Sequence, residues 1–164
     1  MAKNSNKVKR NTNKGNNFQL LADNRYAKFQ YTISEKIEAG IELLGTEVKS
    51  IRNGKANLRD GYCSFRDGEI LLLNVHVSQH KNVGSFFNHD PLRNRKLLLK
   101  KKEIIKLQSN AEKKGMTIIP LSLYIKGSWI KVKIGVGKGK KLYDKRQSDK
   151  QKNIKREIKS ALNR

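Results

Sequence analysis

Two histidines and one cysteine are the side chains of this 164-residue sequence that best suit metal binding. His76 and His80 are four residues apart at the end of an expected strand, and Cys63 precedes them on a neighbouring strand. Three such ligands without a recognised spacing are weak evidence of a metal site, because structural zinc sites use closely spaced pairs of ligands. Ordinary polar strand positions are the favoured interpretation, and we expect no metal and no other cofactor.

The remaining groups that could support catalysis also lack the required arrangement. Glu38, Glu42 and Glu47 lie near one another in the sequence, but a helix start or a salt bridge explains each of them. Segment 135–141 is rich in glycine and lysine, yet it lacks the spacing of a phosphate-binding loop and the Ser or Thr after its lysine. No nucleophile is paired with a base, so we predict that the protein is not an enzyme.

The charge of the sequence indicates a polyanionic partner. It has 37 Lys and Arg against 14 Asp and Glu, a formal net charge of +23, whereas solubility needs a magnitude of only about 2–8. Nucleic acid is the commonest partner of such a basic chain. One dense basic run suits phosphate contacts, because its like charges repel one another unless an anion relieves them. The run comprises Arg93, Arg95, Lys96, Lys100, Lys101, Lys102 and Lys106.

Composition divides the chain into one domain and two tails. Residues 1–16 are basic and poor in apolar side chains, so we expect a disordered N-terminal tail. Residues 17–137 hold all five Phe and the single Trp, and are numerous enough for one core. Residues 138–164 are again strongly basic and form the expected flexible C-terminal tail. No apolar run could span a membrane, and the single cysteine suits a reducing, cytoplasmic compartment.

Local patterns in residues 17–137 predict both strands and helices. Phe29, Tyr31 and Ile33 alternate with polar residues, which is typical of a half-buried strand. Thr46 is expected to cap a short helix that ends at residues 53–54. A longer helix is predicted over residues 97–114, with a basic last turn and a glycine stop.

Two hairpins complete the predicted domain. Residues 62–65 and 70–77 flank Asp67-Gly68, which is a strong signal for a two-residue turn. Residues 116–124 and 129–136 form the second expected hairpin. Several antiparallel strands with a few helices predict a mainly β fold, a small barrel of the oligonucleotide-binding type that carries flexible basic N- and C-terminal tails.

The expected C-terminal tail combines a basic hinge around Gly139 with one apolar stripe. Ile154, Ile158, Ala161 and Leu162 fall on a narrow helical face, and basic residues occupy the rest of the helix. Such a segment is marginal as an isolated helix in water, so we expect it to be unfolded when free and to fold against a polyanionic groove. A nonspecific electrostatic tail is the alternative. A membrane-surface helix is disfavoured because no Trp or Phe would anchor it.

Several stretches resemble one protein family. They are Glu38-Ala-Gly-Ile-Glu-Leu-Leu-Gly-Thr-Glu-Val-Lys-Ser-Ile-Arg52, Arg95-Lys-Leu-Leu-Leu99, Pro120-Leu-Ser-Leu-Tyr124 and Lys131 to Lys141, followed by Asp144-Lys-Arg146. From about Asn24 to Arg146 the sequence resembles the SsrA-binding protein (SmpB) family, the bacterial partner of transfer-messenger RNA. The resemblance implies a small barrel that binds the tRNA-like domain of this RNA and takes it to stalled ribosomes. It also implies a tail that becomes helical in the empty mRNA channel, so that the stalled peptide receives a degradation tag.

The resemblance also implies roles for individual residues. Glu38 and Leu98 match positions on the RNA-binding face, and Lys100 replaces a short polar residue there with a side chain that could contact a phosphate. Phe29 stands where the family often has His, and it can stack on a base without hydrogen bonding to it. Asp144, Lys145 and Arg146 match a motif that acts in the decoding centre, after a hinge glycine at Gly139.

We therefore expect an RNA-binding adaptor whose partners are transfer-messenger RNA and the ribosome. Elongation factor Tu is a further partner that the aminoacylated RNA implies, and a monomer without a membrane partner is expected. The alternatives are a structural ribosomal protein and a metal-dependent nuclease that uses His76 and His80. The predicted RNA-binding residues are Phe29, Glu38, Arg93, Arg95, Lys96, Leu98, Lys100, Lys101 and Lys138. The predicted tail residues that contact the ribosome are Gly139, Lys140, Lys141, Asp144, Lys145, Arg146, Lys152, Ile154, Lys155 and Ile158.

Overall fold

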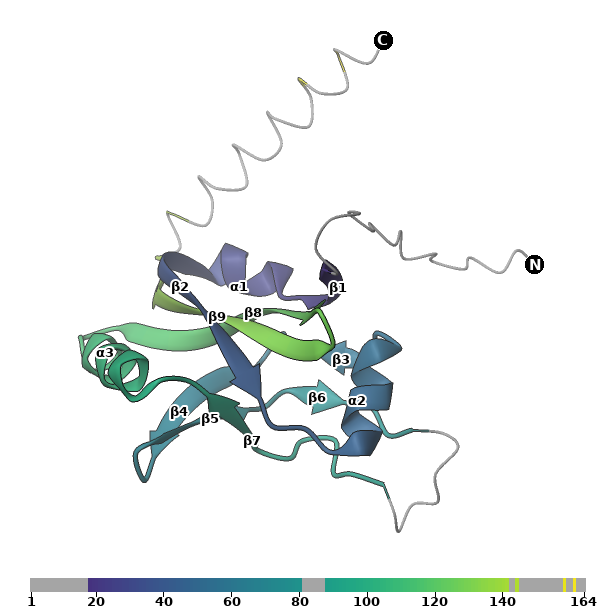
Figure 1. The fold of residues 1–164 in the computed structure, drawn as a ribbon. Helices are drawn as coiled ribbons and strands as arrows, with labels where there is room; N and C mark the ends of the chain where they lie inside the picture. The colour runs from purple at the N-terminus through teal and green to yellow at the C-terminus, as the bar shows by residue number, and fades with distance from the viewer. Residues whose placement is uncertain (1–17, 81–87, 142–143, 145–157, 159–160, 162–164) are drawn as a thin grey trace.

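A computed structural model describes residues 18–80, 88–141, 144, 158 and 161. Most of them form an antiparallel sheet of seven strands, with a second sheet of two short strands and three helices around it (Figure 1). The elements in chain order are β1 (Phe18–Asp23), α1 (Arg25–Gln30), β2 (Tyr31–Ile41), α2 (Gly45–Arg52), β3 (Ala56–Asn57), β4 (Tyr62–Arg66), β5 (Glu69–Leu73), β6 (His76–Val77), β7 (Arg95–Leu98), α3 (Lys101–Ala111), β8 (Met116–Lys126) and β9 (Trp129–Gly139).

The large sheet closes into a ring. Its strand order is β1-β8-β4-β5-β7-β2-β9, and an additional pairing of β9 with β8 joins the two sides. Register shifts in β2, between Ile33 and Glu35, and in β8, between Pro120 and Ser122, mark the irregular points of these long strands. Bulges of this kind increase twist and bend, which a small closed sheet requires. The predicted mainly β barrel is confirmed.

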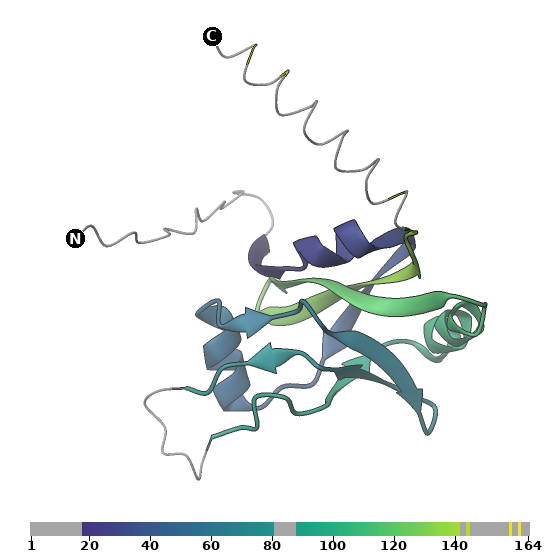
Figure 2. The ribbon, with the colours of Figure 1, turned by 180° about the vertical axis from the view of Figure 1, so that it is seen from behind.

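The ring encloses one main apolar core. Ile70, Leu72, Val132 and Ile134 are fully buried on facing strands, and Leu107 of α3 joins them. Helices α2 and α3 lie at opposite ends of the barrel, and α1 runs along the side formed by β8 and β9 (Figures 1 and 2). Among the described residues, no helix is both long and apolar enough to cross a membrane.

Both hairpins form where local turn chemistry predicts them. Asp67 and Gly68 have φ values of 52° and 75° and join β4 to β5. A positive φ at both central positions is what the tightest hairpin turns require. The second hairpin joins β8 and β9, with Lys126 paired to Trp129. The predicted strand 70–77 is shorter than expected, because the chain turns at Asn74 (φ 53°) and then enters the separate strand β6.

Three local predictions are wrong. The expected helix over 97–114 begins at Lys101, because residues 95–98 form β7 between β5 and β2. Phe29 lies on helix α1 rather than on a strand. Leu44 rather than Thr46 caps α2, and the Glu47 carboxylate accepts the Leu44 backbone N–H at 2.8 Å.

Candidate nucleic-acid interface

Strand register brings one row of side chains together across the outer surface of the barrel. Tyr124 of β8 pairs with Lys131 of β9, Lys131 with Gly40 of β2, and Gly40 with Leu98 of β7. Directly paired residues in neighbouring strands point to the same face of a sheet. Leu98 is 52% exposed on this face, so the row offers an apolar side chain next to cationic ones.

Gly40 has no side chain, so nothing fills the space between Leu98 and Lys131 in this row. A Cβ added at Gly40 would stand 3.1 Å from the Leu98 Cβ, closer than ordinary van der Waals contact. A larger residue would push Leu98 aside and cover the middle of the row. The surface between Leu98 and Lys131 is therefore open to a ligand.

Glu38 is the centre of the site. It lies two residues before Gly40 on β2, so the two residues share a face. Its carboxylate accepts a hydrogen bond from the Tyr124 hydroxyl at 2.5 Å. It also pairs with the Lys126 ammonium at 3.1 Å and the Lys131 ammonium at 3.2 Å. One carboxylate thus fixes the positions of two lysines and a tyrosine.

These contacts keep Glu38 ionised. The hydrogen bond from Tyr124 lowers the pKa of Glu38 most, and Lys126 and Lys131 lower it further against the opposing effect of desolvation, to about 2. Burial, together with the hydrogen bond to Glu38, raises the pKa of the Tyr124 hydroxyl, which therefore stays protonated and donates. The Glu38 carboxylate is therefore ionised at the near-neutral pH at which the protein would bind RNA.

The surroundings of Glu38 carry an excess of positive charge, and Phe18 adds exposed aromatic surface above Tyr124, which is itself only 2% exposed. The Lys133 ammonium lies over the Tyr124 ring, 5.6 Å from its centroid. The Phe18 ring packs against the Tyr124 ring with centroids 4.9 Å apart, and the exposed Leu20 pairs with Tyr124 from β1. We name Glu38, Leu98, Tyr124, Lys126, Lys131 and Lys133 the Glu38 surface. Three lysines against one glutamate suit a phosphate backbone, and exposed Phe18 suits a base.

The predicted basic run does not form one surface. The Arg95 side chain is fully buried, so its predicted role as an RNA ligand is wrong. Its guanidinium donates to the Glu47 carboxylate at 2.8 Å and to the Val75 carbonyl at 2.7 Å. Arg93 is partly exposed but also binds the Glu47 carboxylate, at 2.8 Å. Both arginines hold the β7 end of the barrel against α2.

Two lysines of the run are neutralised within the protein. The Lys96 ammonium binds the Glu69 carboxylate across β5 and β7, and the Lys106 ammonium binds the Glu35 carboxylate. Lys96 lies on strand β7, whereas Lys100 stands just before α3, so these two lysines do not share a helical face. Lys100 and Lys101 are exposed at the start of α3, and their RNA contacts stay predictions.

Phe29 is the remaining predicted RNA ligand of the barrel whose environment differs from expectation. It is half-buried on α1 with its ring centroid 6.5 Å from that of Tyr26. It therefore lies with the helix at the side of the barrel, and its stacking on a base stays a prediction.

The expected hinge is attached to the barrel. Lys138 and Gly139 belong to β9, where Gly139 pairs with Tyr31. The Lys140 N–H donates to the Gln30 carbonyl at 2.8 Å, and the Lys141 N–H donates to the Asp144 carboxylate at 3.2 Å. The described chain thus continues without a gap to Lys141, four residues beyond the expected boundary at 137.

The structure describes three positions beyond Lys141. Asp144, Ile158 and Ala161 have helical backbone and are exposed. The predicted ribosome contacts at Lys145, Arg146, Lys152, Ile154 and Lys155 lie outside the described residues, as does the predicted N-terminal tail.

The metal-site alternative receives no support from the geometry. Cys63 is buried in β4, where desolvation raises the pKa of its thiol. His76 is exposed on β6. Within the part of the chain that the structure describes, no three His, Cys, Asp or Glu side chains gather in a way that could hold a metal ion.

Four residues of the Glu38 surface were missed by sequence reasoning: Tyr124, Lys126, Lys131 and Lys133. A signal for two of them was present, because Lys131 and Lys133 alternate with buried Val132 and Ile134. That period of two predicts that both lysines face outward on one side of a strand. Nothing local links them to Glu38, which is 93 residues from Lys131 in the sequence.

Comparison with known proteins identifies the family. Residues 21–164 match the model of the SmpB protein family. The chain belongs to the SmpB family. It is 87% identical over its whole length to the whole of the SsrA-binding protein of Prochlorococcus marinus strain AS9601. It is 60% identical to that of Synechococcus sp. strain CC9902 over 88% of this chain and 86% of the relative.

A solved structure extends the similarity to the fold. A chain described as "tmRNA-SmpB: a journey to the center of the bacterial ribosome" superposes with a TM-score of 0.63 at 43% identity, over 81% of this chain and 93% of that one. The SmpB match begins within β1 and includes α1 to α3 and β2 to β9. It therefore contains all of the Glu38 surface.

Proposed function

We propose that the protein is an RNA-binding adaptor of trans-translation. In this role it binds the tRNA-like domain of transfer-messenger RNA, delivers the RNA to stalled ribosomes, and stands in for the missing anticodon arm. The arrangement of Tyr124, Lys126 and Lys131 around the Glu38 carboxylate is the observation that carries the proposal. A fixed cationic surface of this kind, with the exposed Phe18 beside it, suits a folded RNA.

The ribosomal part of the role falls to the C-terminal tail. Its residues would occupy the decoding centre and the empty mRNA channel, where rRNA neutralises their charge. Transfer-messenger RNA and the ribosome are therefore the partners, with elongation factor Tu joining through the aminoacylated RNA. The role requires no catalytic step by this chain and places it in the cytoplasm with the ribosomes.

Binding of transfer-messenger RNA by the full chain tests the first half of the proposal. Lys131→Gln with Lys133→Gln removes two charges from the Glu38 surface and should weaken binding by about tenfold or more. Lys113→Gln with Lys114→Gln removes the same charge from exposed positions after α3, and should have a markedly smaller effect. Equal losses in both double variants would reduce the site to nonspecific electrostatics.

Truncation of the tail tests the second half. Ending the chain after Lys141 retains the hydrogen bond between Lys140 and Gln30, so the barrel should keep its fold and bind transfer-messenger RNA within a few-fold. Tagging of stalled peptides should be lost. A full-length variant with a shuffled tail sequence is the matched control, and full tagging by that variant would show that tail charge alone suffices.

A further inference from the structure

A polar and aromatic pocket lies at the opposite end of β8 from the Glu38 surface. It has a volume of about 440 Å³ and is formed by α1, the start of β2, the loop between β3 and β4, and the first residues of β8. Thr117 of β8 lines it, seven residues before Tyr124 of the Glu38 surface. Seven strand residues span roughly 23 Å, so the two sites are separate.

The walls of this pocket are held in place by buried contacts. The Asn24 side chain donates to the Leu58 carbonyl at 2.7 Å and to the Pro120 carbonyl at 2.9 Å, and accepts the Ala27 N–H at 3.0 Å. Asn24 is buried, and these bonds tie α1, the β3–β4 loop and β8 together. The pocket is therefore formed before any ligand arrives.

Gly61 brings the loop close to β8. A Cβ at this position would stand 2.6 Å from the Val75 Cγ2 and 2.9 Å from the Pro120 Cγ, so any side chain here would force its neighbours to shift. The Gly61 N–H also donates to the Leu58 carbonyl at 3.1 Å. The close approach fixes the neighbouring residues Asp60 and Tyr62 at the rim of the pocket.

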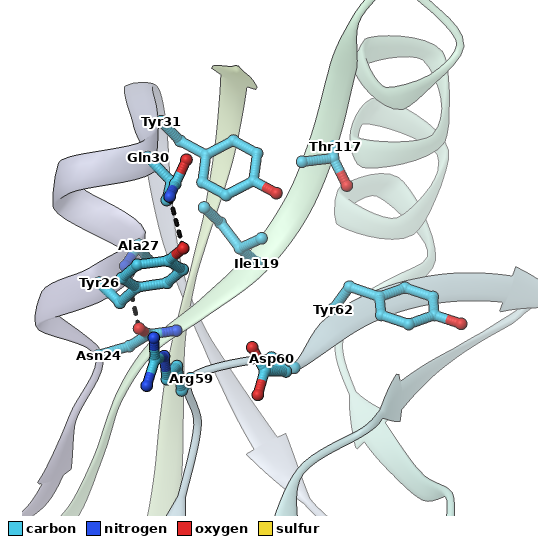
Figure 3. Close-up of a pocket in the computed structure, with 11 residues that line it drawn as sticks. Asn24, Tyr26, Ala27, Gln30, Tyr31, Arg59, Asp60, Tyr62, Thr117 and Ile119 are labelled. Carbon is cyan, nitrogen blue, oxygen red and sulfur yellow. Dashed lines mark hydrogen bonds between the residues drawn. The ribbon is translucent and has the colours of Figure 1, made fainter. Parts of the chain in front are cut away.

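Aromatic rings form much of the pocket wall. Figure 3 shows Tyr26 and Tyr31 on one side of it and Tyr62 on the other. Tyr62 is 43% exposed and Tyr26 is 38% exposed. The Arg59 guanidinium covers one face of the Tyr26 ring, 4.6 Å from its centroid. Exposed rings beside a guanidinium plane are the surfaces on which unpaired bases stack.

Polar groups at the rim could distinguish one base from another. Asp60 lies between Arg59 and Tyr62 (Figure 3), and Gln30 and Thr117 line the same space. The Gln30 amide donates to the Tyr26 hydroxyl at 2.6 Å, which fixes that ring. A carboxylate repels phosphate, so on a chain of net charge +23 it suits a ligand with hydrogen-bond donors. Guanine offers two adjacent donors on its Watson–Crick edge, enough for both carboxylate oxygens.

We infer that this pocket binds an unpaired nucleobase of RNA, with guanine preferred, by stacking on Tyr62 and Tyr26 and by hydrogen bonding to Asp60. It is a second RNA contact, separate from the Glu38 surface. The inference takes from the proposed function only that the partner is RNA.

Mononucleotides test the pocket without the rest of an RNA. Guanosine, adenosine, cytidine and uridine monophosphates are added to the full ¹⁵N-labelled chain, and backbone amide shifts are followed by NMR. Guanosine monophosphate should shift the amides of Gln30, Tyr31, Asp60 and Tyr62 with an affinity about fivefold higher than that of uridine monophosphate. Inorganic phosphate should leave these amides unchanged, and shifts of the same size with phosphate would overturn the inference.

Paired variants separate stacking from base recognition. Asp60→Asn should remove the guanine preference, whereas Asp67→Asn, the same change at an exposed turn of the β4–β5 hairpin, should leave it intact. Tyr62→Ala should weaken binding of all four nucleotides, and Tyr62→Phe, which keeps the ring, should restore it. Equal effects of the two Asp variants, or no loss with Tyr62→Ala, would contradict the assignment.

The Glu38→Gln variant distinguishes this inference from the proposed function. It should lose affinity for transfer-messenger RNA and still bind guanosine monophosphate like the unchanged protein. If the unchanged protein binds the nucleotide but not transfer-messenger RNA, the proposed function is wrong and the pocket assignment stands. If it binds the RNA but no mononucleotide shifts the pocket amides, the pocket assignment is wrong.

Discussion

Two carboxylates of this protein each hold two cationic side chains, in opposite environments. Glu47 is fully buried and binds the guanidinium groups of Arg93 and Arg95, each at 2.8 Å. Glu38 has a side chain that is 33% exposed, and it binds the ammonium groups of Lys126 and Lys131 at 3.1 and 3.2 Å. Both clusters join distant segments of the chain.

The partners of the two carboxylates match their environments. Arginine is less strongly hydrated than lysine and presents several donors in a fixed plane, so it suits the buried cluster, where Arg95 also binds the Val75 carbonyl at 2.7 Å. Lysine is a flexible, hydrated point charge that can turn from a carboxylate towards a phosphate. The comparison indicates that the Glu47 cluster stabilises the fold and that the Glu38 cluster prepares a surface for a ligand.

The largest expected effect is on the buried cluster. Glu47→Gln would leave the Arg95 charge buried without its counter-ion and should lower the free energy of unfolding by about 3–5 kcal/mol. Urea unfolding followed by circular dichroism measures the change. A loss below about 1 kcal/mol would contradict a structural role for the cluster.

Two further variants serve as controls for Glu47. Glu35→Gln removes a partly exposed carboxylate that binds Lys106, and it should cost less than about 1 kcal/mol. Glu47→Leu combined with Arg95→Met removes both buried charges and should recover much of the loss, because an apolar pair of similar volume needs no desolvation. The double variant remains measurable if Glu47→Gln alone fails to fold.

Glu38→Gln should have the opposite profile to Glu47→Gln, with a loss of RNA affinity and little loss of stability. Binding to transfer-messenger RNA should weaken by about tenfold, because Lys126 and Lys131 lose the charge that positions them. The free energy of unfolding should change by less than about 1 kcal/mol, since the released groups reach water. Simple charge arithmetic predicts tighter binding after removal of a negative charge, so the sign of the change in affinity decides between positioning and repulsion.

The sequence predicts what depends on neighbouring residues. Asp67 and Gly68 specify a hairpin turn because both adopt a positive φ, and the alternation in β9 follows from its own side chains. The strand at 95–98 escaped prediction because its pairing with Ile70 and Gly40 is non-local. Periodicity in so short an apolar stretch does not separate a strand from a helix.

The residues of the candidate site also divide into those that the sequence predicts and those that depend on non-local contacts. The resemblance to the family implied roles for Glu38 and Leu98, and strand register places the two residues on one face. Arg95 looked like an RNA ligand because basic residues surround it in the sequence, whereas its burial depends on Glu47, 48 residues away. Charge along a chain therefore identifies the class of partner but not which cations reach it.

The smallest expected effect concerns the hydrogen bond between Tyr124 and Glu38. This bond contributes most to the low pKa of Glu38, about 2 against an ordinary 4.5. A depressed folded-state pKa means that stability from Glu38 is present above pH 4.5 and is lost as the pH falls towards 2. Tyr124→Phe should raise the pKa of Glu38 towards 4.5 and move this loss to higher pH, at a cost near neutral pH of about 1 kcal/mol or less.

Carbon-detected NMR of the Glu38 carboxyl group measures the pKa in both proteins. Lys126 and Lys131 still bind the carboxylate in the variant, so the pKa should stay below 4.5 rather than reach it. RNA affinity at neutral pH should fall less than with Glu38→Gln, because the charge that positions the lysines remains. An unchanged pKa in Tyr124→Phe would mean that the lysines alone set the ionisation of Glu38, and the buried Tyr124 ring would then only support Phe18 and Lys133, which pack on it.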